Sequence, residues 1–249
     1  MDNIERRGYS FQLSESRVDV LSPTTCAETS ENSQRSKPTW DAWNICVTIM
    51  DLINHILIII VTVFLLCYSL HSLTVTNVHV ALCTVGAIVI LAGDDIPTKF
   101  LSRRAKYYIH IGLQILGLIC NIAGVVIMYR AKKRHFLSIH GITGFTSLVI
   151  MCFLAVFGYP VFIAMKLRKY IRPVTIKFLH NFLGIVCFVV GMVSQCYGYE
   201  KSWLAYATNS MENIELICII LTGIITVLSL RGAIPSLFRQ GAAMFSKDD

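Results

Sequence analysis

The chain has 249 residues, of which 55% are hydrophobic, and its formal net charge is +7. A soluble domain of this length would not be so apolar throughout, so the composition favours an integral membrane protein. The basic residues lie in short clusters between apolar runs, as they do in membrane proteins, and the positive charge therefore gives no indication of nucleic-acid binding. Nine cysteines without a CxxC or any regular spacing predict neither a disulfide framework nor a zinc site.

Residues 1–39 are rich in polar and charged side chains, so we expect a disordered tail without a signal peptide. Six apolar runs follow, each with about the twenty residues that a helix needs to cross a hydrocarbon core of about 30 Å. They cover residues 44–70, 75–93, 107–129, 139–165, 174–198 and 214–230. The predicted fold is therefore all-α, a six-helix transmembrane bundle at 40–235 followed by a C-terminal tail at 236–249.

The distribution of lysine and arginine predicts that both termini lie in the cytoplasm. With that orientation, seventeen of these residues fall on the cytoplasmic side and five on the opposite side. The third loop departs from the rule, because four of those five, Arg130, Lys132, Lys133 and Arg134, lie there. The charge of this loop therefore needs another explanation.

Four of the seven histidines lie within two turns of the start of successive apolar runs. Because successive helices run in opposite directions, His79 and His140 are expected on the non-cytoplasmic side, and His110 and His180 on the cytoplasmic side. The two levels should be about 15 Å apart. Two histidines that face each other suit axial ligation of one haem iron, whereas a structural zinc site needs four ligands. The alternative is that each histidine only makes a hydrogen bond inside the bundle.

Each of these histidines is followed by a glycine on its own helix face. Gly86 and Gly117 come seven residues after the histidines of the second and third runs, and Gly144 and Gly184 come four residues after those of the fourth and fifth. Such glycines leave space for the edge of a porphyrin, or they serve as ordinary helix contacts in the membrane. His55, one turn from Asp51, has no partner at its level and is expected to be a polar contact that faces the bundle.

The histidine-containing segments resemble the cytochrome b-561 family, and the resemblance covers about residues 44–230. It is specific in the stretches NVHVALCTVG, SRRAKYYIHIGLQ, SIHGITGF and FLHNFLGIVCFVVG. One branch of that family also has a histidine five residues before the third ligand, as His135 is here. The resemblance implies two b-type haems held by helices 2–5, with His79 paired to His140 and His110 to His180. It also implies ascorbate as the cytoplasmic electron donor, and monodehydroascorbate or a ferric chelate as the acceptor on the far side.

Basic side chains near both histidine levels are candidate contacts for these anions and for haem propionates. On the cytoplasmic side they are Arg103, Arg104, Lys106, Arg172 and Lys177. On the opposite side they are Lys132, Lys133, Arg134 and His135. The alternative is that these residues only set the orientation of the chain in the membrane.

The predicted function is transmembrane electron transfer by an ascorbate-dependent reductase in the endoplasmic reticulum or another endomembrane. Its expected partners are ascorbate, the acceptor and the lipid bilayer, and a homodimer remains open. A proton or metal transporter lined by histidines is one alternative, but it would need polar residues through the midplane, where the sequence has Val, Ile, Leu, Phe, Gly and Cys. A non-catalytic haem-binding subunit is a second alternative, which the sequence does not exclude.

Overall fold

The computed structural model describes residues 42–94 and 102–245, so the predicted disordered tail at 1–39 lies outside the described residues. This part of the chain is helical and contains no strand. The long helices are α1 (Ala42–Ser69), α2 (Val75–Asp94), α3 (Arg103–Ala131), α4 (Ile139–Phe162), α5 (Pro173–Tyr199) and α7 (Ile214–Phe245). Two short elements complete the fold, a 3-10 turn at Leu167–Lys169 and the six-residue helix α6 (Ser202–Ala207).

All six long helices are long and apolar enough to cross a membrane, which confirms the predicted six-helix fold. Two features differ from the sequence prediction. Helix α6 was not predicted, because six residues are too few for a recognisable apolar run. Helix α7 continues past the apolar run that ends at residue 230, through Pro235, so residues 236–245, which were expected to be a tail, are helical.

Two serines fix where the histidine-bearing helices begin. Ser102 caps α3 by accepting a hydrogen bond from the backbone N–H of Ala105, and Ser138 caps α4 through the N–H of Gly141, both at 3.2 Å. Each cap satisfies one of the donors that the first turn of a helix leaves unpaired. These starts place His110 two turns into α3 and His140 at the second residue of α4.

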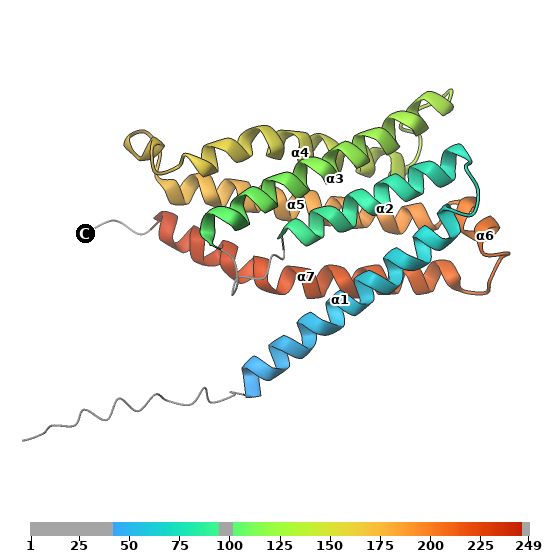
Figure 1. Cartoon of the computed structure of the whole chain (residues 1–249), viewed down its shortest axis with the longest axis horizontal. Helices are drawn as coiled ribbons and strands as arrows, with labels where there is room; N and C mark the ends of the chain where they lie inside the picture. The colour runs from blue at the N-terminus through green and yellow to red at the C-terminus, as the bar shows by residue number, and fades with distance from the viewer. Residues whose placement is uncertain (1–41, 95–101, 246–249) are drawn as a thin grey trace, which may run out of the picture. The chain divides into compact units, whose positions relative to one another are not determined.

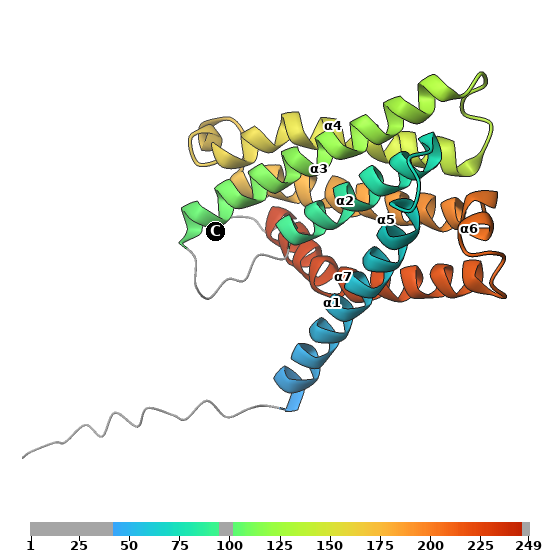
Figure 2. The ribbon, with the colours of Figure 1, turned by 45° about the vertical axis from the view of Figure 1, so that its right-hand side comes forward.

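The central helices form two close pairs, α2 with α3 and α4 with α5, and α7 lies along α5 (Figures 1 and 2). Small residues allow the close approach within each pair. A Cβ atom added to Gly86 of α2 would lie 2.9 Å from the carbonyl oxygen of Gly117 in α3. These two glycines are therefore helix contacts, and the interpretation as porphyrin space is wrong for them.

The α4–α5 pair uses the same spacing on both helices. Gly144 and Ser147 of α4 lie against Ser194 and Gly191 of α5, respectively. A Cβ at Gly144 would lie 2.9 Å from the hydroxyl of Ser194, and one at Gly191 would lie 3.1 Å from the hydroxyl of Ser147. Each serine thus occupies the space that the opposing glycine leaves, and the two helices interlock over one turn.

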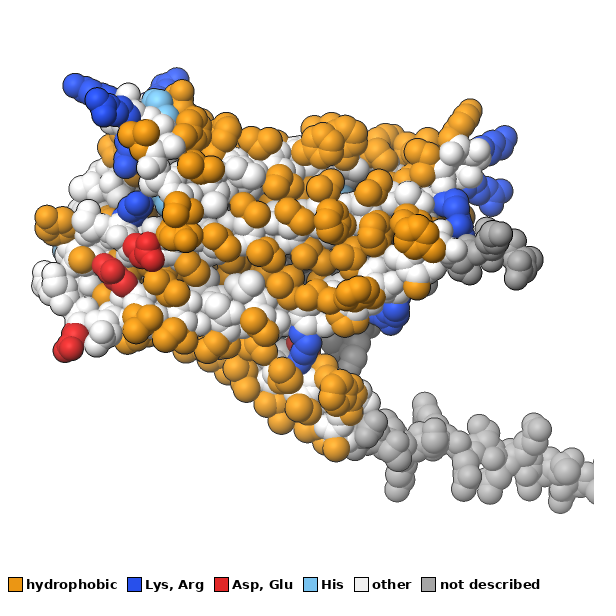
Figure 3. Space-filling view, turned by 180° about the vertical axis from the view of Figure 1, so that it is seen from behind, with side chains coloured by type: hydrophobic (Ala, Val, Ile, Leu, Met, Phe, Trp, Pro, Cys, Tyr) orange, Lys and Arg blue, Asp and Glu red, His pale blue; other side chains and the backbone are white. Residues whose placement is uncertain are grey.

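Large apolar side chains cover the flank of the bundle, while lysine and arginine side chains gather toward its two ends (Figure 3). Val156 and Val227, for example, are each 70% exposed. Contiguous apolar surface of this extent indicates contact with lipid. His55 is also exposed, and its Nδ1 lies 2.5 Å from the carbonyl oxygen of Asp51 in its own helix. The expected polar contact is therefore confirmed, but its partner is in the same helix and the side chain is exposed rather than enclosed by the bundle.

Candidate functional site

His79 of α2 and His140 of α4 face each other across the bundle. Their ring centroids are 6.2 Å apart and their planes are inclined by 85°. Two imidazole–metal bonds of about 2 Å each account for about 4 Å of this separation. The remainder is the distance from ligating nitrogen to ring centre in the two imidazoles. The pair is therefore spaced to hold one metal ion between two imidazoles.

Hydrogen bonds select the tautomer of both rings. The Nδ1 atom of His79 lies 2.9 Å from the carbonyl oxygen of Gly124, and that of His140 lies 2.9 Å from the carbonyl oxygen of Ser194. A carbonyl oxygen can only accept, so each Nδ1 carries the proton and donates it. The Nε2 atom of each ring then keeps its lone pair, which is the form that binds a metal.

The second pair, His110 of α3 and His180 of α5, lines the same cavity at a second level; we call it the inner pair, and His79 with His140 the outer pair. The Nδ1 atom of His180 is buried and has no hydrogen-bond partner among the described residues. A Cβ added to Gly158 would lie 3.6 Å from the His180 ring, which is ordinary van der Waals contact. His180 is thus held by fewer hydrogen bonds than either histidine of the outer pair.

The two levels are separated by the same number of residues on both sides of the bundle. Gly124, which accepts from His79, is fourteen residues after His110, and Ser194, which accepts from His140, is fourteen residues after His180. At about 1.5 Å per residue this is about 21 Å. The predicted separation of about 15 Å is therefore too short.

One cavity of about 2670 Å³ connects both levels and is lined by all four histidines. A single ligand pocket typically measures about 300–1000 Å³, so this cavity has room for more than one large ligand. Gly184 lines it and has no atom within 4 Å of an added Cβ, which agrees with the interpretation as porphyrin space at this position. Gly144 also lines the cavity, but its missing side chain makes room for Ser194.

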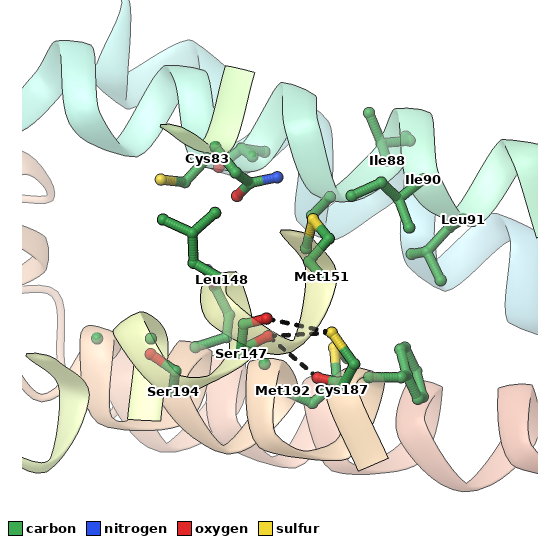
Figure 4. Close-up of a pocket in the computed structure, with 18 of the residues that line it drawn as sticks. Cys83, Ile88, Ile90, Leu91, Ser147, Leu148, Met151, Cys187, Met192 and Ser194 are labelled. Carbon is green, nitrogen blue, oxygen red and sulfur yellow. Dashed lines mark hydrogen bonds between the residues drawn. The ribbon is translucent and has the colours of Figure 1, made fainter. Parts of the chain in front are cut away.

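The middle of the cavity is dominated by apolar and sulfur-containing side chains. Figure 4 shows Cys83, Ile88, Ile90 and Leu91 of α2 opposite Ser147, Leu148 and Met151 of α4 and Cys187 and Met192 of α5. Ser147 donates to the carbonyl oxygen of Cys187 at 3.1 Å, and the Cys187 thiol donates to that of Ser147 at 3.3 Å. The polar atoms of this pair are thus used in holding α4 to α5.

The predicted acceptor residues fall only partly on the cavity. Lys132, Arg134 and His135 line its mouth at the end nearer to the outer pair, whereas Lys133 does not line it. The His135 ring stacks on Tyr129, with centroids 3.8 Å apart and planes inclined by 14°. Lys201 also lines the mouth. The sequence indicates Lys201 only as a charge that sets orientation, although its place two residues before Trp203 is a usable signal for an interfacial site.

Helix α6 covers part of the same mouth. The indole N–H of Trp203 donates to the side-chain oxygen of Asn77 at 2.6 Å, and the Asn77 amide donates to the backbone and hydroxyl oxygens of Ser72. Asn77 is buried and lies two residues before His79. Leu204 is fully buried in the adjacent core. These contacts hold α6 against the start of α2.

The predicted donor residues lie away from the cavity. Arg104, Lys106, Arg172 and Lys177 are not among the residues that line it, and the side chain of Arg103 lies outside the described residues. Arg172 donates to the carbonyl oxygens of Met244 at 3.0 Å and Ala243 at 3.3 Å. These bonds satisfy acceptors that the last turn of α7 leaves unpaired, so part of the role of Arg172 is to fasten that helix.

Comparison with known proteins agrees with this geometry. Residues 70–205 match the family model for eukaryotic cytochrome b561. The chain belongs to the cytochrome b561 family. Cytochromes b561 bind haem b, so this chain is a transmembrane haem protein. The matched segment begins directly after α1 and ends within α6, and it contains both histidine pairs, while the whole of α1 and the whole of α7 lie outside it.

A curated relative is the lysosomal membrane ascorbate-dependent ferrireductase CYB561A3 of Mus musculus, 23% identical over 145 residues. The alignment covers 55% of this chain and 60% of the relative, less than two thirds of its length. No solved structure matches this cytochrome b561.

Proposed function

We propose that this cytochrome b561 is an ascorbate-dependent transmembrane oxidoreductase of an endomembrane, with both termini on the cytoplasmic side. Cytoplasmic ascorbate, an anion at neutral pH, loses one electron and one proton and becomes monodehydroascorbate, and the proton is released on the same side. The electron reduces an acceptor on the opposite side, either a ferric chelate to the ferrous state or a second monodehydroascorbate radical. Membership of the family and the ferrireductase relative support this proposal.

The observation that carries the proposal is the geometry of the outer histidine pair, whose ring separation and tautomers fit a bis-imidazole metal site. We propose that His79 and His140 would hold one haem b, and that His110 and His180 would hold a second. The haem supplies one-electron redox chemistry when it is bound. The protein holds each imidazole, keeps Nδ1 protonated at the outer pair, and surrounds the space between the levels with side chains that exclude water.

At the cytoplasmic end, the basic residues at the starts of α3 and α5 attract the ascorbate anion. Arg104, Lys106 and Lys177 lie outside the cavity, so they act through the field at its entrance rather than by direct contact within it. Salt weakens this field, and it does so most at Arg104 and Lys177, whose side chains are exposed.

At the opposite end, Lys132, Arg134 and His135 form the acceptor entrance together with Lys201. All four line the mouth of the cavity that leads to His79 and His140. An anionic ferric chelate or the monodehydroascorbate anion would be favoured there over a neutral acceptor. This role accounts for the charge of the loop that departs from the orientation rule.

The composition of the cavity middle favours this function over a proton or metal transporter. The hydroxyl of Ser147 and the thiol of Cys187 bond to the opposite backbone, and Asn121 and Gln114 donate to carbonyl oxygens of α3 and α2. Three of these polar groups therefore join neighbouring helices, and Asn121 bonds within its own helix. A hydrophobic shell around a redox centre controls solvent access and potential, which suits electron transfer.

Visible spectroscopy of the purified holoprotein tests the proposal. The oxidised protein should show the absorption of a low-spin b-type haem, and ascorbate should convert a substantial part of it to the reduced form. Dithionite then gives the fully reduced reference. A protein that binds haem, is reduced by dithionite and stays oxidised in excess ascorbate would contradict the assignment of ascorbate as the donor.

A further inference from the structure

Ser194 makes three polar contacts with His140, two of them to the Nδ1 atom of the ring. Its carbonyl oxygen lies 2.9 Å from His140 Nδ1, and its hydroxyl donates to the carbonyl oxygen of His140 at 3.0 Å. The hydroxyl oxygen is also 3.3 Å from His140 Nδ1. A hydroxyl has one proton, which is used here toward the carbonyl, so its oxygen faces Nδ1 as an acceptor. The Nδ1–H of His140 therefore has two acceptors on one residue.

Two glycines leave the space that these contacts between Ser194 and His140 occupy. A Cβ atom on Gly144 would lie 2.9 Å from the Ser194 hydroxyl, so any larger residue would push that hydroxyl away. A Cβ atom on Gly198 would lie 3.2 Å from both Cε1 and Nδ1 of the His140 ring. Ser194 is only 5% exposed, so the hydrogen bonds are shielded from competing water. Residues from α4 and α5 thus enclose one edge of a single imidazole.

Two of the other candidate ligands, His79 and His180, have fewer acceptors. His79 donates to one carbonyl oxygen and has the Cys83 thiol at 3.7 Å, and His180 Nδ1 has no partner among the described residues. Acceptors on the remote nitrogen make an imidazole a stronger electron donor to its metal. A stronger donor stabilises ferric iron relative to ferrous iron, and hydrogen bonding around a haem ligand is one of the means by which a protein sets the haem potential.

We infer that Ser194 is a positioning residue that lowers the reduction potential of the haem held by His79 and His140. This inference rests on the proposed function. It concerns the side-chain hydroxyl of Ser194, because the carbonyl oxygen persists in any substitution. The Ser194 hydroxyl oxygen acts as a second acceptor for the Nδ1–H of His140, and it contacts neither the iron nor a substrate.

The experiment is a spectroelectrochemical titration of the holoprotein, with the outer haem identified by its loss in His79→Ala. Ser194→Ala removes the second acceptor and should raise the potential of the outer haem only. One hydrogen bond corresponds to roughly a two- to tenfold change in the reduction equilibrium, the upper end being about 59 mV for one electron. Ser194→Thr keeps the hydroxyl and should restore the original potential.

Ser147→Ala is the matched control. It makes the same chemical change on the same α4–α5 seam (Figure 4), but the hydroxyl of Ser147 bonds to Cys187 rather than to a histidine. Both potentials should stay at their original values in this variant. An equal shift in Ser147→Ala and Ser194→Ala would show that helix packing, not the hydroxyl, sets the potential, and would overturn the inference.

A second variant keeps the test decisive if Ser194→Ala loses the outer haem. Gly144→Ala adds a methyl group that displaces the Ser194 hydroxyl, so it should also raise the reduction potential of the outer haem. Unchanged potentials in both variants, in a protein that ascorbate still reduces, would refute the inference and leave the proposed function standing. Failure of the proposed function has a different signature, because the unmodified protein would then bind no haem or resist ascorbate.

Discussion

At the outer pair, both Nδ1 atoms have a carbonyl oxygen at 2.9 Å, whereas at the inner pair the Nδ1 of His180 is buried with no hydrogen-bond partner among the described residues. The two outer acceptors are backbone carbonyl oxygens at places where neighbouring helices come close. Gly124 of α3 packs against α2, and Ser194 of α5 lies against Gly144 of α4, one turn before Gly198. The inner level has more open space, because Gly184 has no neighbour within 4 Å of an added Cβ. The protein thus fixes the outer imidazoles more rigidly than it fixes His180.

The largest effect is expected from removing an axial ligand. His79→Ala and His140→Ala should each abolish binding of the same haem and leave the other in place, because one imidazole cannot hold the low-spin bis-histidine state. The haem-to-protein ratio should fall by about half. The pairing would be wrong if His79→Ala and His110→Ala depleted the same haem.

The next largest effect, on thermal stability, is expected from substituting a glycine that makes a helix contact, compared with one that faces open space. Gly86→Ala should destabilise the protein by about 1–3 kcal/mol, because the new Cβ meets Asn121 and the backbone of α3. Gly184→Ala meets no protein atom, so it should leave the stability of the haem-free bundle unchanged. Thermal unfolding in detergent measures both. Equal destabilisation by the two variants would remove the distinction between a packed outer level and an open inner level.

The acceptor entrance offers a matched pair of neighbouring lysines. Lys132→Gln should slow reduction of anionic ferric chelates by about two- to fivefold, because Lys132 lines the cavity mouth. Lys133→Gln should have a smaller effect, since Lys133 does not line it. Initial rates with charged and uncharged acceptors, at low and high salt, provide the comparison. Equal losses for both acceptor types would point to damage at the outer haem.

The smallest effect is expected at the donor end. Lys106→Gln should slow ascorbate reduction by about twofold at low salt, because Lys106 acts from outside the cavity. Reduction by dithionite should be unaffected. Stopped-flow traces at two ionic strengths measure the change. A loss of tenfold or more that persists in high salt would instead show a direct contact between Lys106 and ascorbate.

Much of the fold follows from the sequence, because long apolar runs and serine caps act locally. The four histidines also stand out, since ionisable groups are rare at membrane depth. Helix α6 and the extension of α7 beyond Pro235 were missed, because their stability comes from Trp203, Leu204 and the contact of Arg172 with α7 rather than from an apolar run.

The environment of the histidines was not predictable in the same way. Gly86 and Gly184 have the same type of position relative to a histidine, yet one is a helix contact and the other faces open space. The difference depends on which neighbour each helix packs against, which is a property of the tertiary structure. The carbonyl oxygens of Gly124 and Ser194 carry no sequence signal, because every residue has one.

Transmembrane reduction in sealed vesicles is the most direct test of the central proposal, electron transfer across the bilayer from ascorbate to an acceptor. The purified holoprotein would be placed in liposomes that enclose a ferric chelate and a ferrous indicator, and ascorbate would be added outside. Ferrous iron should accumulate inside these vesicles, and not in protein-free vesicles or in vesicles with His140→Ala. Haem that becomes reduced by external ascorbate, without ferrous iron appearing inside, would contradict electron transfer across the membrane.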